Sequence, residues 1–200
     1  MGATEKPQML RSRDITAKLA EFVANLRFED LPSDVIRLAK NSFLDTLGIA
    51  LAGATEEAPK ILTRFVMEMG GKTVASVVGQ GCRTTSPQAA LVNGTAADIL
   101  GWSDISVIQM NHPSVSVCPA AWAVGEQLGS SGKDVLLAHI VGVEIANKIG
   151  AGVRPGLQLK GWHPLGVLNT FGCAAAAGKL LGLGAGGTAN ALGIAGAEAS

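Results

Sequence analysis

The stretch NGTAADILGWSDISVIQMNHPS, residues 93–114, marks the point where a long apolar segment gives way to a polar loop that ends in His-Pro. Upstream, Ser86 and Pro87 are residues that favour a helix start, so we expect a helix from there to about Leu100. Downstream, Pro113 leads into a second apolar segment. The stretch therefore predicts a helix, a polar loop and another helix.

Apolar residues recur at helical spacing through most of the remaining chain. The segment Thr73–Gln80 is instead short, β-branched and bounded by glycines, so we expect a lone strand or an extended connection there. Gly150–Gly161 should be a loop, and the second half of the 33–53 helix should be buried. Helices are expected at residues 14–26 (with Asp14 as N-cap), 33–53, 58–69, 86–100, 115–128, 134–149, 165–181 and from 188 onward.

Composition favours an all-α fold. The 200 residues include 26 Gly, and only 4% of them are aromatic, which suits closely packed helices with a core of small residues better than a β-sandwich. We expect residues 1–13 to be a disordered tail and residues 14–200 to be one helical domain. The helical pattern continues up to Ser200 without a cap, so we expect this domain to be incomplete at its C-terminus.

Charge and cysteine usage exclude several classes of protein. The 16 basic and 16 acidic residues balance, which argues against nucleic-acid or anionic-membrane partners. The apolar segment Gly166–Leu183 is interrupted by polar residues and reads as a core helix, not a membrane span. Three cysteines without C-x-x-C spacing indicate neither a zinc site nor a disulfide framework. With no secretory signal, we expect a cytoplasmic protein.

Familiar cofactor motifs are absent or out of context. No H-E-x-x-H, P-loop or G-x-S-x-G occurs, so metal, nucleotide and serine-hydrolase chemistry have no support. Residues 182–187 match G-x-G-x-x-G, but they follow an Ala-rich helical run and not a strand. We interpret them as a turn between helices and predict no metal and no cofactor.

Two of the three histidines, His112 and His163, directly precede a proline and then a helix. Each therefore lies at a helix N-terminus, where free N–H groups and the positive end of the helix dipole attract anions. The same field disfavours imidazolium and keeps the ring neutral, as a general base requires. Two such ends could bind a polycarboxylate. Simple helix capping by both histidines explains the pattern equally well.

Other polar residues in the loop have ordinary explanations. Asp104 could orient a histidine, and Ser106 and Asn111 could hold substrate oxygens, but each taken singly is better explained as a turn residue. His139 lies on the apolar side of a helix and reads as a core histidine with its hydrogen bonds satisfied. The indoles of Trp102 and Trp162 could be pocket walls or plain packing.

Several motifs together resemble the MmgE/PrpD family, which includes 2-methylcitrate dehydratase, cis-aconitate decarboxylase and iminodisuccinate epimerase. The resemblance covers nearly the whole chain after residue 14. It is carried by EDLPSDVIRLAKNSFLDTLGIALAG (29–53), NGTAAD (93–98), NHPSVSVCPAAWAVGE (111–126), GWHPLGVLNTFGCAAAAGKLLGL (161–183) and NALGIAGAEAS (190–200).

The resemblance implies the N-terminal part of a large helical domain, with an α+β lid domain beyond residue 200. It also implies a homodimer without cofactor that acts on small di- and tricarboxylates by proton abstraction. On this basis we predict His112, His163 and Asp104 as catalytic, and Ser106, Asn111, Ser114 and Trp162 as substrate-binding. A family lysine would lie beyond Ser200, so these 200 residues alone should be inactive.

The loop before His112 departs from the family pattern. An Asp that family members carry falls at Gly101 or Trp102 here, depending on the direction of counting, and Ser106 stands near the family Thr. Our first hypothesis is a lyase of the 2-methylcitrate dehydratase type that removes water. An epimerase, racemase or decarboxylase of the same family is the alternative. A non-catalytic helical dimerisation module is a further one.

Overall fold

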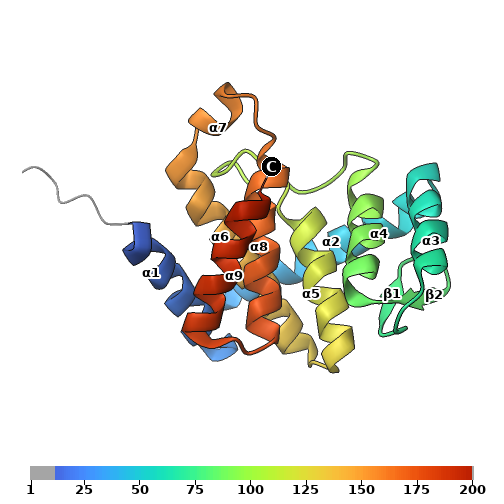
Figure 1. Cartoon of the computed structure of the whole chain (residues 1–200), viewed down its shortest axis with the longest axis horizontal. Helices are drawn as coiled ribbons and strands as arrows, with labels where there is room; N and C mark the ends of the chain where they lie inside the picture. Colours follow the sequence, from blue (N-terminus) through green and yellow to red (C-terminus); the bar gives the residue numbers. More distant parts are fainter. Residues whose placement is uncertain (1–11, 200) are drawn as a thin grey trace, which may run out of the picture.

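Helices dominate the computed structural model, which describes residues 12–199 (Figure 1). Two short strands, β1 (Ala75–Val77) and β2 (Cys82–Thr84), pair as an antiparallel hairpin. The all-α prediction is confirmed. The helices are α1 (Ser12–Asn25), the 3-10 turn η1 (Phe28–Asp30), α2 (Ser33–Gly53), α3 (Glu57–Met69), α4 (Ser86–Asp98), α5 (Ser114–Leu128), α6 (Gly132–Val153), α7 (Gly156–Leu159), α8 (Pro164–Leu180) and α9 (Gly184–Glu198).

Small residues let α6 and α8, the most extensively contacting helix pair, approach closely. A Cβ placed on Gly142 of α6 would lie 2.6 Å from the Gly172 carbonyl oxygen, and one on Gly172 of α8 would lie 2.9 Å from the Gly142 carbonyl oxygen. Real Cβ atoms essentially never come this near to backbone, so glycine is required at both positions. The predicted small-residue core is confirmed at this crossing.

Around this pair the other helices form a layered bundle. In Figure 1, α4, α5 and α8 lie side by side, α9 covers α8, and α2 passes behind to contact α4, α5 and α6. The first helix packs on the last, α1 on α9. One apolar cluster joins α1, α6, α8 and α9 through Val23, Leu137, Val141, Ile145, Ala175 and Leu192.

Local sequence explains most helix starts. Ser131 accepts a hydrogen bond from the Asp134 N–H and so caps α6. In α4 the N-cap is Thr85, one residue before the predicted Ser86, and Gln88 completes a capping box. The first helix begins at Ser12, two residues before the predicted cap Asp14. Residues 1–11 of the predicted tail lie outside the described residues.

Three expectations about elements are wrong. The Thr73–Gln80 segment contains a strand, as one alternative predicted, but the strand is not a lone one: it pairs in a hairpin, because Gly79 and Gly81 adopt positive φ angles and reverse the chain. The predicted loop 150–161 instead contains the last turn of α6 and the short helix α7. In α2, Leu44 and Leu51 are more than half exposed, although the second half was expected to be buried; the buried positions of the helix are Ala39, Thr46, Ile49, Ala50 and Gly53.

The longest helix of the described residues, α6, is a core element. By length and composition alone, α6 could cross a membrane, the one helix of the described residues that could. Half of its most apolar 18-residue window is nevertheless buried inside the protein. The Gly166–Leu183 segment, predicted to be a core helix, forms most of α8 and buries Leu168, Gly172, Ala175, Ala176 and Gly178.

Candidate functional site

His112 lies two residues before α5, next to the N-cap residue Pro113, and is half-buried. Its Nδ1 atom is 2.8 Å from the backbone carbonyl oxygen of Asp104 and 3.1 Å from Ser103 Oγ. Because a carbonyl oxygen can only accept, Nδ1 carries the hydrogen. In the neutral ring Nε2 therefore holds the lone pair, and Nε2 is the atom that can take up and release a proton.

Asp104 contacts His112 through its backbone, while its carboxylate is used elsewhere. Asp104 Oδ2 accepts from Ser114 Oγ at 2.5 Å, and Oδ1 accepts from the Ser114 N–H at 3.2 Å. Ser114 is the first residue of α5, so the carboxylate already lies at the positive N-terminal end of this helix. The expected anion site at α5 is thus filled from within the chain.

A cavity of about 330 Å³ lies between α2, α6 and the start of α5. Two predicted site residues, Asp104 and Ser114, line it together with Ser42 and His139. His112 and His163 are not among its lining residues. Between Gly101 and the start of α5, only Asp104 and Ser114 line the cavity.

The far half of the loop is held by buried amides. The backbones of Ser106 and Asn111 pair as an isolated antiparallel bridge, and Ser106 Oγ donates to Asn147 Oδ1 at 2.6 Å. Asn111 Nδ2 donates to Asn169 Oδ1 at 2.6 Å, and Gln109 Nε2 donates to Asn147 Oδ1 at 2.8 Å. Ser106 and Asn111 thus have structural partners, and their roles towards substrate stay predictions.

His163 occupies the N-cap position of α8 and is exposed. Its side chain makes no capping hydrogen bond to the N-terminal turn of α8. The preceding Trp162 is 49% exposed, and its contact with substrate stays a prediction. Trp102, at 66% exposure, is likewise at the surface.

The two histidine-bearing helix ends are linked by Asn169 of α8. Its Nδ2 donates to the His112 carbonyl oxygen at 3.0 Å and to Ser116 Oγ at 3.2 Å. His163 lies six residues before Asn169, which corresponds to about 9 Å along a helix axis at 1.5 Å per residue. The described structure contains no hydrogen bond or ring contact between His112 and His163. The fold therefore brings both to the same end of α5 and α8 without joining them directly.

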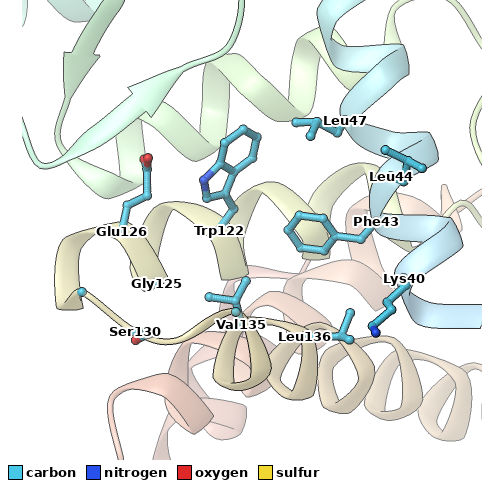
Figure 2. Close-up of a pocket in the computed structure, with 12 residues that line it drawn as sticks. Lys40, Phe43, Leu44, Leu47, Trp122, Gly125, Glu126, Ser130, Val135 and Leu136 are labelled. Atoms are coloured by element: carbon cyan, nitrogen blue, oxygen red, sulfur yellow. The ribbon is translucent and has the colours of Figure 1, made fainter. Parts of the chain in front are cut away.

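A larger cavity, about 700 Å³, lies away from these residues between α2, α5 and α6 (Figure 2). Phe43, Leu47 and Trp122 give it mainly apolar walls, with Lys40 and Glu126 at opposite ends. The Glu126 carboxylate is engaged by the Ser76 N–H and hydroxyl group. The cavity contains no predicted site residue, so its size does not make it the candidate site.

The described residues offer neither a reactive buried thiol nor a cluster of metal ligands. Burial raises the pKa of Cys118 and raises that of Cys173 to about 12, so both thiols stay protonated near neutral pH. Among the described residues, no group of three or more His, Cys, Asp or Glu side chains could hold a metal ion.

Sequence reasoning missed several polar residues near His112. Ser103 is a direct partner of the ring, Ser42 contacts Ser114, and Asn169 fixes the backbone at His112. For Asn169 a signal existed, because it is an amide within an otherwise apolar helix. His139 was read as a satisfied core histidine, but only its Nε2 has a partner, and the buried Nδ1 has none.

Comparison with known proteins identifies the family of this chain. The MmgE/PrpD N-terminal domain matches residues 17–200. The chain is 34% identical over 181 residues to a human cis-aconitate decarboxylase and covers 37% of it. It is 33% identical over 187 residues to one from Aspergillus terreus (strain NIH 2624 / FGSC A1156) and covers 38% of it. These alignments include 88% and 90% of the present chain.

The chain belongs to the MmgE/PrpD family. It spans less than two fifths of the length of these relatives. The mouse cis-aconitate decarboxylase matches similarly, at 33% identity over 181 residues, 88% of this chain and 36% of the relative. A cis-aconitate decarboxylase is a lyase, so membership supports a lyase or decarboxylase role at the level of the family.

Proposed function

We propose that the protein is a cofactor-independent lyase that decarboxylates a small di- or tricarboxylate, with His112 as the proton-transfer residue. The observation that carries the proposal is the fixed His112 ring, whose Nδ1–H is held by the Asp104 carbonyl oxygen at 2.8 Å. The decarboxylase relatives favour loss of carbon dioxide over the loss of water that the sequence first suggested.

In this mechanism His112 supplies or removes a proton at Nε2. Breaking the bond to the departing carboxylate leaves an electron pair on the substrate, and that pair ends as a C–H bond once a proton arrives. Because Nδ1 keeps its own hydrogen on the Asp104 carbonyl, the ring exchanges protons at Nε2 alone. A positioned acid–base group of this kind contributes typically about 10²–10⁴-fold to the rate.

The N-terminal turn of α8 is proposed to bind a substrate carboxylate. Asp104 already occupies the end of α5, whereas the N-cap side chain of α8 makes no capping hydrogen bond. His163 at this N-cap adds a donor beside the free backbone N–H groups. The homodimer and the cytoplasmic location remain predictions from the resemblance and the sequence.

Proton NMR of the reaction in heavy water separates the candidate reactions. The intact protein is incubated with cis-aconitate and, separately, with 2-methylcitrate. We expect loss of carbon dioxide from cis-aconitate, with one deuteron retained in each product molecule. An alkene formed from 2-methylcitrate by loss of water would replace this proposal with dehydration. Deuterium exchange without loss of either group would indicate an epimerase.

Replacement of His163 tests the substrate-binding end. His163→Ala should lower kcat/KM by roughly 10²-fold or more, because it removes a polar group proposed to contact substrate. Its circular dichroism should not change, since the side chain is exposed and caps nothing. The exposed neighbour Lys160 is the control, and Lys160→Ala should keep wild-type activity. Full activity in His163→Ala would rule out this role.

A further inference from the structure

A row of hydrogen-bonded side chains runs from the core to the loop that carries the His112 contact. His139 Nε2 in α6 lies 2.9 Å from Ser42 Oγ in α2, and Ser42 Oγ lies 3.3 Å from Ser114 Oγ in α5. Ser114 Oγ in turn lies 2.5 Å from Asp104 Oδ2. Four separate segments of the chain therefore meet in one polar row, in which His139 and Ser114 are almost completely buried.

The direction of donation in this row is determined by its carboxylate end. An ionised carboxylate only accepts, so the Ser114 hydroxyl donates to Asp104. The Ser42 hydroxyl can then donate to Ser114, and Ser42 in turn accepts from the Nε2–H of His139. If Ser42 donated to His139 instead, no hydrogen would lie between the two serine oxygens. In the one consistent arrangement, each group donates a hydrogen bond to the next, from His139 through Ser42 and Ser114 to Asp104.

The row ends on the peptide that orients His112. Asp104 gives its carboxylate to Ser114 and its backbone carbonyl to His112 Nδ1. We propose that Ser42 and His139 are positioning residues for His112. By anchoring the Asp104 side chain they hold the Asp104 carbonyl in place and keep His112 in the Nδ1–H tautomer. The positioning of the ring follows from the contacts alone, and this inference rests on the proposed function only where it takes His112 Nε2 to be the catalytic atom.

The two halves of the His112 loop, residues 101–112, are held by different contacts. Its far half is held by the Ser106–Asn111 bridge and by Arg154, which donates to the Val107 and Ile108 carbonyl oxygens. In the described structure the Asp104 carboxylate is held by Ser114 alone. The serine row therefore anchors the Asp104 side chain, while the Ser103 hydroxyl group contacts the His112 ring directly.

Ser42 offers a matched pair of variants. Threonine and valine have nearly the same shape and differ by one hydroxyl group, and the cavity that Ser42 lines has room for an added methyl group. Ser42→Thr should keep the row, whereas Ser42→Val should break it. Ser42→Ala, which removes the hydroxyl without adding volume, replaces the valine variant if that protein does not fold.

The readout is the tautomer of His112 in the intact protein labelled with ¹⁵N-histidine. At a pH where the ring is neutral, two-bond ¹H–¹⁵N spectra distinguish a hydrogen on Nδ1 from one on Nε2, with His112→Gln identifying the signal. Wild type and Ser42→Thr should show the Nδ1–H form, and Ser42→Val should shift towards a mixture. In an assay of decarboxylation, kcat of Ser42→Val should fall roughly 10- to 100-fold relative to wild type, with little change in KM.

The outcomes separate this inference from the proposed function. A folded Ser42→Val or Ser42→Ala protein that keeps the wild-type tautomer overturns the positioning role, whether or not the protein has activity. A shifted tautomer in the variant, combined with a wild-type protein that shows no decarboxylase activity, supports the positioning role and contradicts the proposed function instead.

Discussion

At the scale of single residues, three histidines in one chain have different environments. His112 has its Nδ1 hydrogen bonded to a backbone carbonyl, and His163 is exposed at a helix start. His139 is buried, with Ser42 on Nε2 and with Phe43 packed edge-on against the ring at 5.7 Å. The sequence predicted the first two positions from the following prolines. It could not predict the partners of any ring, because these partners come from distant segments or from an irregular loop.

The buried His139 should make stability depend on pH. Burial lowers the pKa of His139 from 6.5 to about 4. Between these values the unfolded chain binds a proton that the folded protein does not, so the free energy of unfolding falls as pH drops from about 6.5 towards 4. At 1.36 kcal/mol per pKa unit, the loss is at most about 3 kcal/mol.

Urea denaturation at several pH values between 4 and 7 measures this loss. His139→Leu is the comparison, because leucine does not titrate, and its free energy of unfolding should fall less steeply in acid than that of wild type. Parallel curves for the two proteins would show that His139 is protonated equally in both states.

At the scale of elements, periodicity and capping residues predicted most helices, since apolar spacing and Ser, Thr and Pro positions are local signals. The strand β2 and the helix α7 were missed because they are only three and four residues long. The exposed leucines of α2 were missed because the second half of the helix is apolar nearly all round and does not reveal which face is covered.

Glycine-to-alanine substitutions should have opposite effects on stability at two positions, Gly142 at the close approach of α6 and α8 and Gly48 in α2. In Gly142→Ala the new methyl carbon would meet Val117 Cγ1 at 2.5 Å and the Gly172 carbonyl oxygen at 2.6 Å, so we expect a loss of about 1–3 kcal/mol. In Gly48→Ala, within α2, nothing lies within 4 Å, and higher helix propensity should stabilise by about 0.5–1 kcal/mol. Thermal unfolding of both variants measures the difference, and equal destabilisation would contradict the packing argument.

At the scale of the whole molecule, the sequence motifs predicted the family and the helical architecture, because both depend on patterns spread along the chain. The site was predicted only as a set of residues. The structure adds that Asp104 and Ser114 bind each other and that Asn169 connects α8 to the backbone of His112. Such side-chain contacts between α5, α8 and the loop depend on the packed bundle and have no local signature.

The central claim is that His112 transfers a proton in a decarboxylation. The most direct measurement is kcat for cis-aconitate in the intact protein carrying His112→Gln, compared with wild type. Glutamine can still donate a hydrogen bond towards the Asp104 carbonyl, but it cannot exchange a proton. We predict a fall of about 10²–10⁴-fold in kcat with an unchanged melting temperature. A His112→Gln protein that turns over cis-aconitate as fast as wild type would contradict the claim.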